Sequence, residues 1–153
     1  LPVVFLADNP GVLAGQASER AGILRAGARM FAAQTRAQTV KVHVTLRKAY
    51  GFGSSVMAMN PYDEQTLSFG FPGATLGAMG ASGAGNAVGA DEATRAELHQ
   101  AENESSYRSA NGLSFDDLID PRDLRNVVIE SLAVSAQRRS GVATPVARTG
   151  ITP

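Results

Sequence analysis

The sequence contains 153 residues, which is enough for one domain with a hydrophobic core. It carries 14 Lys and Arg against 14 Asp and Glu, so the formal net charge is zero, and this balance argues against binding to nucleic acid or to an anionic membrane. The sequence has no cysteine, which excludes a disulfide framework, a thiolate metal site and a cysteine nucleophile. Its short apolar stretches, and an opening segment unlike a signal peptide, predict a cytoplasmic protein.

The chain opens on a predicted strand. Residues 1–7 form a continuous apolar run, which is typical of a strand buried on both faces in a parallel sheet. Because such a strand needs neighbours on both sides, we expect the chain to be an incomplete domain of a longer protein. After a loop, Ser18 is predicted to cap a helix whose apolar residues recur at helical spacing over 23–31. Gly22 and Gly27 would weaken this helix, which indicates close packing or a ligand.

The next predicted strand leads into a glycine turn. Apolar and polar residues alternate over 40–46, the pattern of a half-buried strand. Gly51-Phe52-Gly53 follow, and residues 56–59 then read as a short buried helix. A strand, a glycine turn and a helix start bring free backbone N–H groups to one point, which suits the stabilisation of a developing oxyanion. The alternative is a glycine turn that only lets the helix pack on the strand.

The second half of the chain continues the alternation of strands and helices. We expect strands over 66–71 and 75–79, a small-residue turn over 80–86, an exposed helix over 91–109, a strand over 113–119 and a last helix from Asp120-Pro121. Leu124, Val127, Val128 and Leu132 would face inward from that helix. This order predicts an α/β architecture in which much of the sheet is parallel.

Several polar residues raise the question of a metal site or a serine hydrolase site. His43 and His99 are far apart and lack clustered partners, so we predict no metal site. A serine hydrolase would need one of these histidines as base, and the chain has no Gly-x-Ser-x-Gly elbow, although Ser54, Ser55 and Ser82 lie at glycine turns.

Two further patterns could be mistaken for a binding site or an acid pair. The glycines over 80–89 have the wrong spacing for a dinucleotide loop. Asp116, Asp117 and Asp120 could form a metal or acid pair, or else a solvated edge and the cap of the last helix.

Five motifs follow one another along the chain: Asp8-Asn9-Pro10-Gly11, Arg47-Lys48-Ala49-Tyr50-Gly51, Phe71-Pro72, Met79-Gly80-Ala81 and Asp120-Pro121-Arg122. In this order they resemble the C-terminal half of the carboxyltransferase (beta) subunit of biotin-dependent acyl-CoA carboxylases of the propionyl- and acetyl-CoA type. The resemblance covers about residues 1–132. We therefore predict a carboxyltransferase domain fragment over 1–139 and a flexible tail over 140–153.

The resemblance implies a crotonase-like fold, a ClpP-like superhelix of ββα units. In this family the active site lies at a dimer interface, and a carboxyl group moves from N-carboxybiotin to the alpha carbon of an acyl-CoA. Biotin is attached to a separate carrier. The implied partners are therefore an acyl-CoA substrate, the biotin carboxylase and biotin carrier subunit, and further copies of the beta subunit in a dimer and then a hexamer.

The resemblance also implies the site residues. The amides of Phe52 and Gly53 would donate hydrogen bonds to the ureido oxygen of biotin as negative charge builds there. The remaining residues implied to bind biotin or substrate lie in the two glycine-rich stretches: Gly51, Ser54, Ser55, Gly80, Ala81 and Gly83. None of these is implied to bind a metal.

The sequence departs from the family at some of these positions. The family has Gly-Gly-Ala where this chain has Gly51-Phe52-Gly53, so the ring of Phe52 must find a place. Ser55 occupies a position that is often acidic in family members and that influences which acyl chain they accept. The resemblance therefore does not predict which acyl-CoA is the substrate. Residues 89–105 depart most from the family pattern. The family's N-terminal half is not in this sequence, so we expect the chain to be inactive alone.

Two other functions remain open at this stage. The chain could be a non-catalytic assembly module of the same fold, because Phe52 could fill the pocket and an exposed sheet edge needs cover. A ClpP-like serine hydrolase shares the broad fold and is the third reading.

Overall fold

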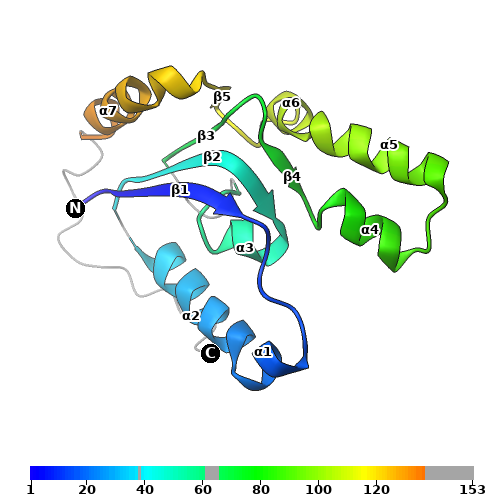
Figure 1. Ribbon diagram of the computed structural model, residues 1–153. Helices are drawn as coiled ribbons and strands as arrows, with labels where there is room; N and C mark the ends of the chain where they lie inside the picture. Colours follow the sequence, from blue (N-terminus) through cyan, green and yellow to red (C-terminus); the bar gives the residue numbers. More distant parts are fainter. Residues whose placement is uncertain (38, 61–65, 137–153) are drawn as a thin grey trace.

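The computed structural model describes residues 1–37, 39–60 and 66–136, and Figure 1 shows a parallel sheet with helices on both sides of it. The strands lie in the order β1 (Val3–Asn9), β2 (Lys41–Tyr50), β3 (Leu67–Gly70) and β5 (Asp117–Leu118), and β4 (Thr75–Gly77) also pairs with β2. Each of these pairings is parallel. The predicted α/β architecture with a parallel sheet is confirmed.

β2 is the central strand, and it is buried on both faces rather than on one. Val42 and Val44 are fully buried in an apolar cluster with Phe69 of β3. The prediction that the alternate residues face solvent is wrong, because Lys41 and His43 are also fully buried. The Lys41 Nζ donates to the Gln34 carbonyl (2.8 Å) and side-chain oxygen (3.3 Å), and such bonds offset the cost of burying a polar group.

The two halves of β2 pair with different strands. Val42 to Thr45 pair with β3, whereas Lys48 to Tyr50 pair with β4. The chain leaves β3 through a bend at Pro72 and Gly73 before it enters β4. As a result the end of β4, and the segment that follows it, lie beside the end of β2.

β1 differs from its prediction. It is a parallel strand, but it lies at an edge, and no second strand pairs with it among the residues that the structure describes. Val3, Val4 and Leu6 are therefore 38, 38 and 49% exposed, whereas Ala7 is fully buried. The expectation of burial on both faces is wrong for the described chain, because an unpaired edge leaves these side chains uncovered.

Two helices replace the one predicted after the first loop. They are α1 (Gln16–Arg20) and α2 (Ile23–Arg36), separated at Gly22, whose φ of +87° interrupts the helix. Ser18 lies inside α1 and does not cap it. Its hydroxyl donates to the carbonyls of Leu13 (2.7 Å) and Gly15 (2.9 Å). Figure 1 shows α2 and the short α3 (Gly51–Ser55) on the side of the sheet opposite α7 (Leu124–Ser135).

The residues after β4 form helices. The predicted turn over 80–86 is wrong, because Ala81–Ala87 form α4. The long predicted helix is two helices, α5 (Glu92–Asn103), capped by the Asp91 side chain, and α6 (Ser105–Asn111). The strand predicted over 113–119 is confined to the two residues of β5.

The final elements agree with prediction. Asp120 accepts a hydrogen bond from the Arg122 amide (2.8 Å) at the start of the 3-10 turn η2 (Pro121–Asp123). The inward residues of α7 pack against the core cluster as expected: Leu124, Val127, Val128 and Leu132.

Within the described ranges, no helix is both long and apolar enough to cross a membrane. The predicted tail over 140–153 lies wholly outside the described residues.

Candidate functional site

The glycine turn is itself the helix α3. β2 ends at Tyr50, and α3 begins at Gly51 with no side chain capping it, so the helix contains the turn rather than following it. Gly51 has a φ of +54°, and a Cβ there would lie 2.9 Å from the Ala78 carbonyl oxygen. Only glycine fits this position without strain. Phe52 and Gly53 stand in the first turn of α3, where backbone N–H groups have no acceptor within the helix.

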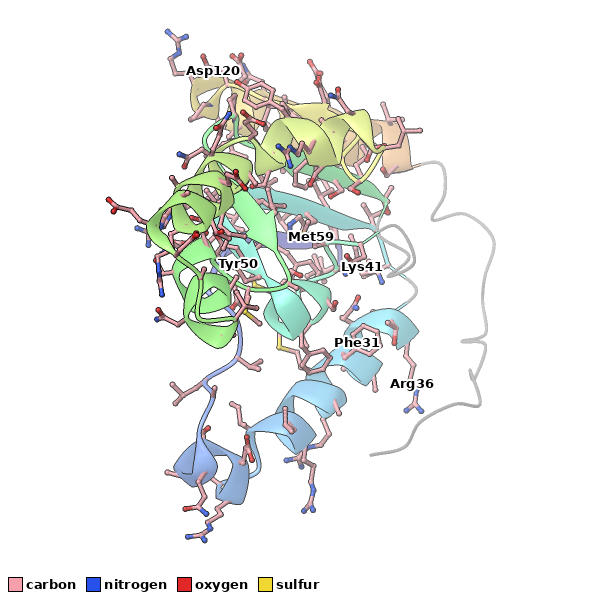
Figure 2. All side chains as sticks on the ribbon, turned by 90° about the vertical axis from the view of Figure 1, so that its right-hand side faces the viewer. Phe31, Arg36, Lys41, Tyr50, Met59 and Asp120 are labelled. Carbon is pink, nitrogen blue, oxygen red and sulfur yellow. The ribbon has the colours of Figure 1, made fainter. Side chains whose placement is uncertain are left out.

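The ring of Phe52 packs against α2. Its centroid lies 6.0 Å from that of Phe31, with the rings tilted by 48°. A Cβ at Gly27 would approach the Phe52 ring to 2.7 Å, so the close packing predicted at Gly27 is confirmed. Figure 2 shows Phe31 on α2, below the sheet and α3. The ring that replaces a glycine of the family pattern therefore has its place between two helices.

Asn9, at the end of β1, fixes the position of α3. Its Nδ2 donates to the Gly53 carbonyl (3.1 Å), and its Oδ1 accepts from the Gly11 amide (2.8 Å). A Cβ at Gly53 would lie 2.5 Å from the Asn9 Oδ1, so any side chain there would displace the Asn9 amide. Sequence reasoning missed Asn9 as a partner of the turn. The available signal was its position, because parallel strands end at the same edge of a sheet and β1 neighbours β2.

The hydroxyls of the two predicted serines are engaged within the fold. The Ser54 Oγ donates to the Gly51 carbonyl (2.7 Å), inside the turn. The Ser55 Oγ accepts from the Asn60 Nδ2 (3.0 Å), and the Ser55 carbonyl accepts from the Gln34 Nε2 (3.2 Å). Both hydroxyls therefore hold α3 in shape.

His43 is a buried structural histidine. Its Nδ1 lies 2.8 Å from the Met57 carbonyl oxygen, which can only accept, so Nδ1 carries the proton and Nε2 accepts from the Thr45 hydroxyl (2.8 Å). Burial lowers the pKa of His43 to about 4, so the ring is neutral at pH 7. No described serine is hydrogen-bonded to His43 or to His99, which counts against the hydrolase reading.

Two of the residues implied to bind biotin or substrate border a cavity of about 400 Å³. Gly80 and Ala81 line it together with Pro10, Lys48, Tyr50 and Glu102. Gly83 and the residues of α3 do not line this cavity, which lies beside the turn and not over it. The structure thus brings Gly80 and Ala81 next to Tyr50, the residue that precedes the glycine turn. Tyr50 is labelled in Figure 2.

The Glu102 carboxylate connects two of the segments that line this cavity. The Tyr50 hydroxyl and the Ala81 amide (3.0 Å) both donate to the Glu102 Oε1, and the His99 Nδ1 lies 3.5 Å from Oε2. Burial alone would raise the pKa of Glu102, but the hydrogen bonds from Tyr50, Ala81 and His99 outweigh it and lower that pKa. Burial, and then the bond to Glu102, raise the pKa of Tyr50. Nothing in the sequence signals this contact.

The side chains of the three acids near the last helix accept hydrogen bonds from backbone amides. The Asp116 Oδ2 accepts from the Ser68 amide (2.7 Å), the Asp117 side chain accepts from the Leu118 amide (2.8 Å), and Asp120 caps η2. Among the described residues no three His, Asp or Glu side chains are grouped to hold a metal ion. These observations favour the capping interpretation over an acid pair.

Comparison with known proteins identifies one matching family and several similar proteins. The family described as the carboxyl transferase domain matches residues 1–149. The methylmalonyl-CoA carboxyltransferase 12S subunit of Propionibacterium freudenreichii subsp. shermanii is 35% identical over 150 residues, 91% of this chain and 28% of that protein. The propionyl-CoA carboxylase beta chain of Saccharopolyspora erythraea is 33% identical over 157 residues, 93% of this chain and 29% of that protein.

A solved structure shows the same fold. The crystal structure of transcarboxylase 12S with hydrolysed methylmalonyl-coenzyme A bound, described as a hexamer assembly, matches 99% of this chain and 29% of its own chain. The TM-score is 0.83 and the identity 34%. The predicted fold of the crotonase-like carboxyltransferases is thereby confirmed. The chain spans less than a third of the length of these relatives. By its match over residues 1–149 and by its fold, the chain belongs to the carboxyl transferase domain family.

Proposed function

We propose that this chain supplies the biotin side of a carboxyltransferase site in an acyl-CoA carboxylase. Biotin, held on a carrier protein, would supply the carboxyl group that an acyl-CoA accepts at its alpha carbon. The observation that carries the proposal is the start of α3 at the end of β2, in a chain that belongs to the carboxyl transferase domain family.

The first amides of α3 suit the charge change on biotin. As the carboxyl group departs, negative charge collects on the ureido oxygen, and the N–H groups of Phe52 and Gly53 would donate hydrogen bonds to that oxygen. Donors held in place by a rigid fold stabilise such charge without reorganising, and each is worth about 3 kcal/mol in comparable sites. The close surroundings of Gly51, and the hydrogen bond from Asn9 to the Gly53 carbonyl, supply this rigidity.

The other site residues would act through backbone and shape. Gly80 and Ala81 would form the second wall, since they line a cavity beside Tyr50. Ser54 and Ser55 would contribute backbone rather than hydroxyl groups, because both hydroxyls are engaged within the fold. Gly83, which lies outside this cavity, would act through the shape of α4.

The reading of the chain as a non-catalytic assembly module rested on an exposed sheet edge, which β1 presents among the described residues, and on a pocket filled by Phe52. The Phe52 ring packs on Phe31 and Gly27 of α2 instead, which supports the catalytic reading. We also propose that the full protein binds an acyl-CoA and a biotin carrier subunit and assembles through further copies, as the 12S relative assembles in a hexamer. A cytoplasmic location remains a prediction, which cell fractionation would test.

A pair of variants at Phe52 tests the proposed donor. Phe52→Pro removes the N–H, and proline is tolerated in the first turn of a helix. Phe52→Leu keeps the N–H but loses the ring contact with Phe31, so it is the matched control. With biocytin (biotinyl-lysine) as the probe, we expect Phe52→Pro to weaken binding on the order of tenfold relative to Phe52→Leu. Equal affinities in two folded variants would contradict the assignment of this amide.

A further inference from the structure

We infer that Glu102 is a positioning residue for the proposed biotin-side site, because one of its oxygens holds the residue before the glycine turn and the first residue of α4 together. The inference rests on the proposed function for its consequence, but not for its geometry. Glu102 lies on α5.

The contact joins three segments that are distant in sequence. The Glu102 Oε1 accepts from the Tyr50 hydroxyl at the end of β2 and from the Ala81 amide at the start of α4 (3.0 Å). Tyr50 and Ala81 are only 4 and 6% exposed, and the Glu102 side chain is 20% exposed. A single carboxylate oxygen with two donors fixes the spacing between those donors more tightly than two separate bonds would.

Tyr50 links this contact to the proposed oxyanion donors. It directly precedes Gly51, so a shift of the Tyr50 ring and backbone passes to the amides of Phe52 and Gly53. Little room is left beside Gly51, where a Cβ would lie 2.9 Å from the Ala78 carbonyl oxygen. The Glu102 bridge adds a side-chain contact to the backbone pairing of Tyr50 with Gly77 of β4, and this side chain can be replaced.

Charge makes Glu102 suited to this place. A carboxylate at the first amide of α4 is favourable, because helix N-termini carry partial positive charge. The Tyr50 hydroxyl serves as a neutral donor, and the His99 Nδ1 lies 3.5 Å from the second oxygen. All three neighbours stabilise the ionised carboxylate. The side chain therefore stays in place as an acceptor at neutral pH.

Four variants of the 153-residue chain test the inference. Glu102→Ala removes the acceptor, Tyr50→Phe removes one donor and leaves the Ala81 contact, and Glu102→Gln keeps an acceptor oxygen of the same shape. Glu97→Ala is the matched control, since Glu97 is an exposed carboxylate on the same helix. The readouts are the amide chemical shifts of residues 51–53 and the dissociation constant for biocytin.

We expect Glu102→Ala and Tyr50→Phe each to shift the amide resonances of residues 51–53 and to weaken biocytin binding on the order of tenfold. Glu102→Gln should restore both readouts, and Glu97→Ala should change neither. A purely stabilising role would change the unfolding midpoint without moving these amide resonances. If Glu102→Ala fails to fold, Tyr50→Phe and Glu102→Gln still test the bridge.

The remaining outcomes separate this inference from the proposed function. If folded Glu102→Ala leaves the resonances of residues 51–53 unmoved, the inference is overturned. It is also overturned if Tyr50→Phe has the amide shifts and the biocytin affinity of the wild type. A third outcome is that Glu102→Ala shifts the resonances of residues 51–53 and Glu102→Gln restores them, but the chain does not bind biocytin. This result would support the role of Glu102 in placing the turn and would count against the proposed function alone.

Discussion

Two glycines and one asparagine determine the shape of the candidate site at the residue scale. A side chain would be strained at Gly51 and Gly53, for different reasons: Gly51 has a positive φ and faces a carbonyl, and Gly53 lies under Asn9. The structure shows that protein atoms already occupy much of the space beside both glycines. This leaves the backbone amides as the groups that α3 can offer to a ligand.

The contact between Asn9 and Gly53 predicts a non-additive pair of substitutions. Gly53→Ala would place a Cβ 2.5 Å from the Asn9 Oδ1, so we expect a loss of about 1–3 kcal/mol in the free energy of unfolding. Asn9→Ala alone should cost about 1 kcal/mol through its lost hydrogen bonds. The double variant should lose less than the sum, as measured by urea unfolding. Strict additivity would mean that the two residues do not constrain each other.

The buried His43 predicts a pH dependence of stability. Its pKa is lowered from 6.5 to about 4 in the folded chain, so the unfolded chain binds the proton more readily. The stabilising contribution is complete above pH 6.5 and is lost as the pH falls toward 4. Its size is about 3 kcal/mol, at 1.36 kcal/mol for each pKa unit.

Unfolding free energies of the wild type and of His43→Gln, measured from pH 7 to pH 4, test this expectation. The difference between the two should shrink across that window. A constant difference between wild type and His43→Gln would contradict the buried neutral histidine.

At the scale of elements, the sequence predicts most strands and helices, but not what covers them. The alternation over residues 40–46 identifies a strand correctly. It misassigns the polar face, because the partners of Lys41 and His43 come from Gln34 and Met57, and such contacts cannot be inferred from local periodicity. Likewise the small residues over 80–86 read as a turn. They form α4 with Glu102 accepting from its first amide, from 21 positions along the chain.

The turn between β2 and α3 predicts a contrast between two glycines. Gly51→Ala introduces a side chain at a φ of +54°, 2.9 Å from the Ala78 carbonyl oxygen, and should cost about 2 kcal/mol of stability or more. Gly73→Ala, on the bend before β4, meets no atom within 4 Å and has no positive φ. It should change stability by less than about 0.5 kcal/mol. Thermal unfolding of both variants measures the contrast, and equal midpoints would refute the steric requirement at Gly51.

For the molecule as a whole, the edge strand β1 shows the limit of reading a pattern without its neighbours. The apolar run over residues 1–7 is correctly read as a parallel strand. Its side chains are nevertheless partly exposed, because no described strand covers its outer edge. The order of motifs correctly indicated the carboxyl transferase domain family. The bridge from Glu102 to Tyr50 and Ala81 could not be predicted, because it joins three distant segments through one side chain.

The central claim is that biotin binds at the start of α3, and an amide-shift titration of the chain with biocytin tests it most directly. The account predicts shifts concentrated at residues 51–55 and 80–83, the turn and the second wall, with little change in α7. A well-dispersed spectrum that does not change on addition of biocytin, or shifts confined to other parts of the chain, would contradict it.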